Sequence, residues 1–328
     1  MLLWILLACR PTDAPDPPSS TTWDRGPNPH AMDDVLRWNH VQTKGTHNSY
    51  HLEPDVPLDP SHLYSHPTLT DQLELYDVRQ VELDVHLTEA GEWQVFHLAV
   101  LDEETTCLAF VDCLSELKAW SDGNGWHLPL MVWLEPKDEL DGVADGLSLI
   151  DEASLLALDD AILEVWPEER LFRPDDLRGS HDTLPDAVSA GWPTLDTMRG
   201  RAVFALLDSG AHRERYLAPS DVLEGRVMFV DAATPEDPYA ALFKDGSDGQ
   251  VGTWADGGFV VTVNGSTAGD ADAEAQAADE DKLSAGAHHV ATDLTTPSDG
   301  YWFDLAPRCH PRTAPEDCDD AEVERLEP

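Results

Sequence analysis

The chain has 328 residues, 41% of them hydrophobic. That is enough for one large core, because a barrel domain takes roughly 250 residues. Lys and Arg total 20 against 64 Asp and Glu, and the formal charge of −44 argues against nucleic acid binding, which needs clustered basic side chains. No internal stretch approaches the ~20 apolar residues of a membrane span. We assign most of the acidic residues to a solvated surface.

The N-terminus reads as an export segment followed by a linker. Residues 1–9 form an apolar run closed by a small residue and Cys9, which is similar to a bacterial lipoprotein signal. The run departs from that pattern because it is short and no Lys or Arg precedes it. The alternatives are a plain secretory signal and a disordered hydrophobic end. Residues 10–34, rich in Pro, Ser and Thr, are predicted to be a disordered tether. Residues 35–328 are predicted to form a single barrel domain, and the chain to be an exported monomer.

Apolar and alternating runs predict eight strands separated by helices or loops. The strands are expected at 41–46, 78–85, 93–98, 130–135, 202–207, 227–230, 259–263 and 289–293. Helices are expected at 70–76, 108–121, 152–166 and 271–284. Eight strands with intervening helices indicate an α/β fold of the TIM-like (β/α)8 type. Because only a turn separates the second and third strands, the barrel is expected to be irregular.

Polar side chains close the first four predicted strands, where a parallel barrel carries its catalytic groups. Residues two apart on a strand face the same side, so each pair on the second and fourth strands should point together. An oxygen-rich set of this kind suits a hard divalent cation such as Ca²⁺. A single E-x-D pair is weak evidence for a metal site, whereas polar residues at the ends of four successive strands are specific evidence for one. The oxygen donors are Asn48, Glu82, Asp84 and Glu135, with His47, His97 and Lys137 beside them.

Four further cysteines form two local pairs, Cys107 with Cys113 and Cys309 with Cys318. In an exported chain, an even number at close spacing predicts two small-loop disulfides. Neither pair has the C-x-x-C spacing that would favour a structural zinc ion at the cysteines.

The order of these motifs resembles a known family. GTHNSY (45–50), VELDVH (81–86), VFH (95–97) and LEPKD (134–138) look like the catalytic half of phosphatidylinositol-specific phospholipase C, and most resemble its bacterial calcium-dependent branch. The likeness covers roughly residues 41–318 and is specific in its first half. It implies an α/β barrel enzyme that cleaves phosphodiesters.

The resemblance also implies roles for single residues. His47 and His97 match the catalytic histidines, and Lys137 matches a contact to phosphate or inositol. The calcium ligands would be Asn48, Glu82, Asp84 and Glu135. Bacterial relatives often carry an arginine-containing stretch after the seventh strand, whereas this chain has VTVNGST at 261–267. Headgroup recognition is therefore the part of the resemblance that the residues do not carry over.

The function that follows is a calcium-dependent phosphoric diester hydrolase. It is expected to cleave phosphatidylinositol or a related inositol lipid to diacylglycerol and inositol phosphate, through attack by the inositol 2-hydroxyl. Membrane association is expected through the lipid anchor at Cys9 and through the substrate. One alternative is a glycerophosphodiester phosphodiesterase that acts on soluble substrates, although that family typically has an H-R-G first motif. Another is a non-catalytic, calcium-binding surface lipoprotein.

Overall fold

The computed structural model describes residue 23 and residues 25–57, 59–138, 144–245, 249–270, 272–297 and 300–324. The predicted signal segment, Cys9 and the tether up to residue 22 lie outside these residues. In the described part, no helix combines the length and apolar character that a membrane span requires.

Eight parallel strands form the centre of the molecule, in the order β7-β6-β4-β2-β1-β10-β9-β8. A parallel bridge between Asp231 and Leu242 joins the two outer strands, so the described sheet closes on itself as a barrel. The predicted TIM-like barrel is therefore confirmed. Its strands are β1 (Val41–Thr46), β2 (Val78–Thr88), β4 (Leu130–Pro136), β6 (Ala202–Leu206), β7 (Phe229–Val230), β8 (Leu242–Lys244), β9 (Val260–Asn264) and β10 (His289–Thr292).

The third predicted strand is not a barrel strand, and this corrects the sequence-based assignment. β3 (Trp93–Val95) runs antiparallel to β2 as a hairpin, with Val85 opposite Val95. A short turn can join only antiparallel neighbours, because a parallel neighbour needs a crossover connection. The missing barrel strand is β8, which the sequence did not predict. Two other short strands, β5 (Leu147–Ser148) and β11 (Arg308–Cys309), add antiparallel pairs to β2 and β1.

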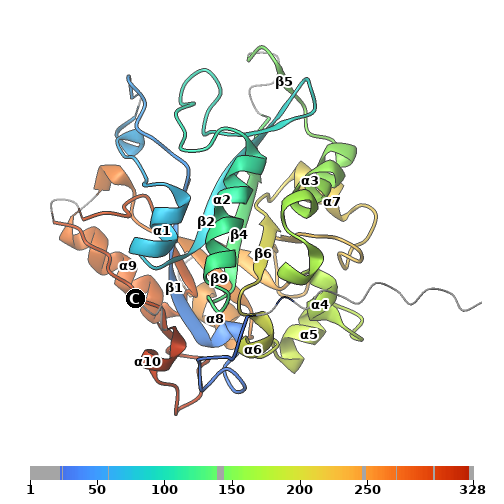
Figure 1. Ribbon diagram of the computed structural model, residues 1–328, viewed down its shortest axis with the longest axis vertical. Helices are drawn as coiled ribbons and strands as arrows, with labels where there is room; N and C mark the ends of the chain where they lie inside the picture. Colours follow the sequence, from blue (N-terminus) through green and yellow to red (C-terminus); the bar gives the residue numbers. More distant parts are fainter. Residues whose placement is uncertain are drawn as a thin grey trace, which may run out of the picture.

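Helices surround the strands (Figure 1). The four predicted helices are present with shifted ends, as α1 (Leu69–Leu75), α2 (Phe110–Gly123), α3 (Glu152–Val165) and α9 (Ala273–Ala285). The carboxylate of Asp151 starts α3 by accepting a hydrogen bond from the Ser154 amide at 2.8 Å. The sequence did not predict the shorter helices α4 (Pro174–Arg178), α5 (Leu184–Ala190), α6 (Leu195–Met198), α7 (Ala211–Leu217), α8 (Gln250–Asp256) and α10 (Asp320–Val323).

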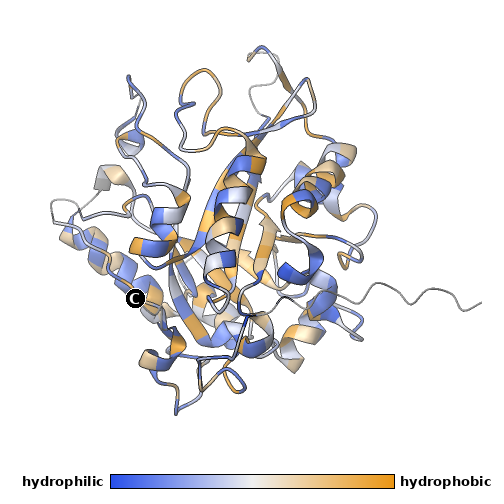
Figure 2. Cartoon of the chain, in the orientation of Figure 1, coloured by the Kyte–Doolittle hydropathy of each residue, from blue (hydrophilic) through white to orange (hydrophobic). Residues whose placement is uncertain are grey.

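The barrel strands carry the hydrophobic core, as the colouring of β6 in Figure 2 shows. All five residues of β6 are buried, and Trp133 on β4 is among the largest fully buried side chains. The indole of Trp133 donates a hydrogen bond to the Thr262 hydroxyl at 3.1 Å. This bond joins β4 to β9, and it satisfies a polar group that burial would otherwise leave unpaired.

Both predicted disulfides are present, Cys107–Cys113 and Cys309–Cys318. The second lies where the C-terminal tail meets the barrel, because Cys309 pairs with Val41 of β1. The Asp320 carboxylate also accepts a hydrogen bond from the Cys309 amide at 2.8 Å. The tail is therefore part of the barrel domain.

The predicted tether ends too late in the sequence. Residues 25–34 were assigned to it, yet Asp33 is buried and its carboxylate lies 2.7 Å from the Arg199 guanidinium, which is also buried. Arg25 donates a hydrogen bond to the Arg199 carbonyl oxygen at 2.7 Å. Polar composition suggested disorder here, but a long-range ion pair fixes this segment against α6.

Replacing Asp33 by alanine is expected to lower the free energy of unfolding by roughly 3–5 kcal/mol, because the variant leaves the Arg199 charge buried without its carboxylate. The matched control is Asp34→Ala, since Asp34 is exposed. It should change stability by less than about 0.5 kcal/mol. Equal midpoints for the two variants in urea unfolding would show that the Asp33–Arg199 pair does not stabilise the fold.

Candidate active site

The first strand ends in a tight turn that ties it to the second. Asn48 follows β1 with a positive φ of 44°, a conformation that asparagine tolerates better than most residues. The turn lets the Ser49 amide donate to the Glu82 carbonyl oxygen at 2.9 Å, while the Glu82 amide donates to the Ser49 hydroxyl at 2.8 Å. The chain after β1 is therefore held against the middle of β2, where the acidic residues lie.

Three predicted carboxylates come together in the barrel. Glu82, Asp84 and Glu135 each offer an oxygen atom, and these oxygens lie within 4.8 Å of one another. The expectation that Glu82 and Asp84 share one face of a strand is confirmed. Asp84 also stands opposite Glu135 in the parallel pairing of β2 with β4, which brings in the third carboxylate.

Asp84 is the least compensated member of this cluster. It is buried, and neither of its carboxylate oxygens accepts a hydrogen bond among the described residues. Its one salt-bridge partner there is Lys137, whose ammonium lies 3.5 Å away and closer, at 2.7 Å, to Glu135. Burial raises the pKa of Asp84 well above its ordinary value, and the Glu135 and Glu82 charges add to the rise while Lys137 opposes it.

Tyr50 connects Asn48 with the acidic cluster. The Tyr50 hydroxyl lies 3.4 Å from the Asn48 amide oxygen, and both side chains are buried. Burial raises the pKa of Tyr50, and the charge of nearby Asp84 raises it further. The tyrosine therefore stays neutral between the amide and the carboxylate.

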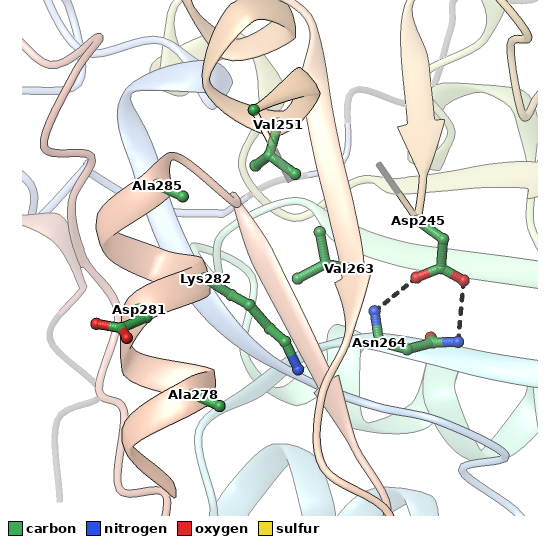
Figure 3. Close-up of a pocket in the computed structure, with 9 residues that line it drawn as sticks. Asp245, Val251, Val263, Asn264, Ala278, Asp281, Lys282 and Ala285 are labelled. Atoms are coloured by element: carbon green, nitrogen blue, oxygen red, sulfur yellow. Dashed lines mark hydrogen bonds between the residues drawn. The ribbon is translucent and has the colours of Figure 1, made fainter. Parts of the chain in front are cut away.

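A lysine that the sequence did not single out contacts Glu82. Lys244 on β8 is buried, and its ammonium lies 2.5 Å from a Glu82 oxygen and 2.6 Å from the Asn264 amide oxygen. Asn264 is held in turn by Asp245, which accepts hydrogen bonds from its backbone and side-chain nitrogens (Figure 3). Burial disfavours ionisation of Glu82, but Lys244 and then His47 outweigh it and hold the Glu82 pKa below its ordinary value.

His47 lies between two acidic groups. Its Nδ1 is 2.7 Å from the Asp293 carboxylate, and its Nε2 is 3.6 Å from Glu82. Burial would lower the pKa of His47, but the Glu82 charge and the hydrogen bond to Asp293 raise it to about 9. The ring is therefore a cation at neutral pH, and part of its edge remains exposed.

His97 does not join this cluster in the described contacts. It follows β3 in a bend, and its Nδ1 lies 2.8 Å from the buried carboxylate of Asp102. Burial disfavours the charge of Asp102, yet hydrogen bonds from His51 and His97 hold its pKa below the ordinary range. The structure therefore pairs each predicted catalytic histidine with an aspartate, Asp293 for His47 and Asp102 for His97, and Asp102 also contacts His51.

Neither aspartate was among the predicted site residues, and neither was Lys244. Asp293 is the last residue of the strand predicted at 289–293, and this position is the one signal that a search of strand ends could have used. Asp102 lies in the turn after β3, and Lys244 on a strand of three residues. Their contacts arise from tertiary structure and leave no local pattern.

The residues fit a hard divalent cation. Two buried oxygens of Asp84 without hydrogen-bond partners leave negative charge that a cation can balance, and Glu82 and Glu135 add oxygens beside them. Carboxylate and amide oxygens are the usual ligands of calcium. Asn48, Glu82, Asp84 and Glu135 are the residues that would hold it.

The chain is similar to a family of known proteins. Residues 36–93 and 86–308 match the family model described as phosphoinositide phospholipase C, Ca²⁺-dependent. No curated protein sequence matches the chain.

Two solved structures illustrate the similarity in fold. A Ca²⁺-dependent phosphatidylinositol-specific phospholipase C from Streptomyces antibioticus is 20% identical with a TM-score of 0.56, over 80% of this chain and 96% of that one. A calcium-dependent phosphoinositol-specific phospholipase C from Pseudomonas sp. is 16% identical with a TM-score of 0.58, over 85% and 96% of the two chains.

Proposed function

Because the chain belongs to the Ca²⁺-dependent phosphoinositide phospholipase C family and is a calcium-dependent phosphodiesterase, we propose that it cleaves phosphatidylinositol to diacylglycerol and inositol phosphate. The observation that carries the proposal is the cationic His47 beside the buried acidic cluster. Together they offer positive charge for a phosphate and carboxylates for a cation and a proton.

Calcium, when bound, supplies positive charge against the phosphate oxygens and the attacking hydroxyl. The inositol 2-hydroxyl oxygen attacks phosphorus and the bond to the diacylglycerol oxygen breaks. His47 stabilises the charge on the pentacoordinate phosphoryl group. His97 protonates the leaving oxygen, and Asp102 orients its ring by accepting a hydrogen bond from Nδ1. Lys137 contributes a further contact to the phosphate or inositol.

Glu135 is the better candidate for the base that removes the hydroxyl proton. Glu82 is buried, its pKa is lowered, and its two oxygens face Lys244 and His47. The Glu135 side chain is 31% exposed and has a single described salt bridge, to Lys137. A substrate hydroxyl can therefore approach Glu135 more readily than Glu82.

An analogue of phosphatidylinositol without the 2-hydroxyl tests this mechanism. We expect no cleavage of the analogue, because the nucleophile belongs to the substrate, while phosphatidylinositol releases inositol phosphate under the same conditions. Cleavage of both lipids would mean that water attacks directly. Rapid cleavage of glycerophosphoinositol with no action on lipid would favour the glycerophosphodiesterase alternative.

We also propose that the protein works outside the cytoplasm, anchored through Cys9. The two disulfides support this, because such bonds persist in oxidising compartments. Mass spectrometry of the N-terminal peptide of the natively expressed protein is the test. A lipid-modified Cys9 as the first residue is expected, and an unmodified Cys9 preceded by residues 1–8 would contradict the anchor.

A further inference from the structure

A second cluster of potential metal ligands lies at the same end of the barrel, in the connections that follow β1 and β3 at the top of Figure 1. Three histidine nitrogens converge on one oxygen, Asp102 Oδ2. They are His97 Nδ1 at 2.8 Å, His51 Nε2 at 3.0 Å and His62 Nδ1 at 3.4 Å. The three rings meet edge to face, with centroids 5.1–6.4 Å apart.

The backbone holds these segments together without help from the cluster itself. The amide of Thr106 donates to the Tyr50 carbonyl oxygen at 2.8 Å, and the amide of Leu52 donates to the Glu104 carbonyl oxygen at 3.2 Å. The disulfide between Cys107 and Cys113 follows directly. His51 and Asp102 therefore sit on a fixed framework, and His62 comes from a separate short helix, Pro60–His62.

The hydrogen bonds of His51 leave a mismatch. Its Nδ1 lies 3.1 Å from the Tyr64 carbonyl oxygen, which can only accept, so this nitrogen carries a proton. In the neutral ring, Nε2 then presents a lone pair to the Asp102 carboxylate, which also only accepts. A proton or a cation must lie between two such acceptors. A histidine whose other nitrogen donates to a backbone carbonyl is also the usual arrangement of a metal ligand.

The spacing of the cluster suits a small ion, because ligand atoms of His51, His97 and Asp102 lie within 4.8 Å of one another, and His62 joins them through its 3.4 Å contact to Asp102. Zinc binds histidine nitrogen and carboxylate oxygen at about 2.0–2.2 Å, which separates neighbouring ligand atoms by about 3.3–3.6 Å. The His62 Nδ1 distance to Asp102 Oδ2, 3.4 Å, falls at this spacing, while the hydrogen-bonded nitrogens of His97 and His51, at 2.8 and 3.0 Å, need to move outward slightly when the ion replaces the hydrogen bonds. Imidazole-rich sets favour zinc and related first-row ions, whereas calcium favours oxygen.

The burial and exposure of the four side chains also suit an ion that enters from solvent. Asp102 and His51 are buried, so the charge of the carboxylate is poorly screened. The side chains of His62 and His97 are 15% and 19% exposed and lie on the open side. An ion can therefore enter past these two rings and reach the buried pair.

We propose that His51, His62, His97 and Asp102 form a zinc-binding site, separate from the calcium ligands, and that its occupation inhibits the enzyme. Binding of the ion displaces the Nδ1 proton of His97 to solvent, and the ion then binds this nitrogen and the Asp102 oxygen, so the hydrogen bond that orients His97 is lost. The inhibition rests on the proposed role of His97 in catalysis. The binding does not.

Zinc binding is measured by competition with a chromophoric chelator in excess calcium, which occupies the oxygen-rich site and the acidic surface. Co²⁺ serves as a second probe, because a tetrahedral site with nitrogen ligands gives intense visible absorption. We expect one ion per chain, bound at least about tenfold more weakly by His62→Gln, as loss of a ligand requires. The matched control is His181→Gln, an exposed histidine outside the cluster, which should bind as the wild type does.

Absence of a one-to-one complex, or equal affinity in His62→Gln and the wild type, would overturn the proposed site. Inhibition is then read as inositol phosphate release against zinc concentration, with each variant normalised to its own rate without zinc. We expect His62→Gln to need at least about tenfold more zinc for half inhibition. Full activity of the zinc-loaded wild type would overturn the inhibition. A protein that binds zinc but cleaves no inositol lipid would instead contradict the proposed function and leave the binding result standing.

Discussion

Alanine in place of His47 is expected to lower turnover of phosphatidylinositol by about 10²–10⁴-fold at saturating calcium. His47 is the one histidine in the described contacts that meets both the acidic cluster, at Glu82, and a carboxylate of its own, Asp293. The loss arises because the variant removes a positive charge from the phosphoryl group in the transition state.

Two further variants separate this role from a structural one. Asp293→Asn keeps the ring but removes a charge that raises the His47 pKa to about 9. Since the cationic ring is the active form, activity should fail at a lower pH on the alkaline side than in the wild type. His181→Gln is the neutral control. Wild-type turnover in His47→Ala, with an unchanged calcium-induced rise in melting temperature, would remove His47 from the mechanism.

Asp84→Asn is expected to act in opposite directions on stability and on calcium binding. Without calcium, the variant should be more stable than the wild type, because it removes a buried charge beside Glu82 and Glu135. With calcium at 100 times the wild-type dissociation constant, the wild type gains about 2.7 kcal/mol, and the variant should lose most of this gain.

The effect of Asp84→Asn on the stability of the calcium-free protein should depend on pH, in a direction that follows from the Asp84 pKa. The pKa of Asp84 is raised in the folded state, so its ionisation destabilises the calcium-free protein increasingly as pH rises above about 4, the ordinary carboxyl value. The advantage of Asp84→Asn should therefore grow from acidic to neutral pH in denaturant unfolding with chelator present. The exposed Asp34→Ala is the control. A variant that is less stable at neutral pH and still stabilised by calcium would contradict the assignment of Asp84 as a ligand.

The sequence was most informative where side-chain period and burial coincide. β1 was predicted with its observed bounds, and the two-residue period of β2 placed Glu82 and Asp84 on one face. β8 was missed because it has three residues and no alternation long enough to see. β3 was misplaced because it was counted by its apolar run alone, although the short turn before it permits only an antiparallel neighbour.

The charges around the site were harder to foresee than the ligands. Lys244 reaches Glu82 across the barrel, and Asp293 reaches His47 from the opposite end of the chain. The sequence lacks the arginine that bacterial relatives often carry after the seventh predicted strand, and headgroup recognition was therefore the part of the resemblance that did not carry over. The structure puts the Lys244 ammonium against Asn264, which lies in that stretch, so a cation is present although no local motif encodes it.

Calcium-dependent release of inositol phosphate from phosphatidylinositol in mixed micelles tests the central claim most directly. The assay compares excess calcium, a calcium-selective chelator, and calcium restored after the chelator. We predict release with calcium, loss with the chelator and recovery when calcium returns, because Glu82, Asp84 and Glu135 form a site that needs a cation to balance it. Release that the chelator leaves unchanged, or no release with calcium present, would contradict the proposed function.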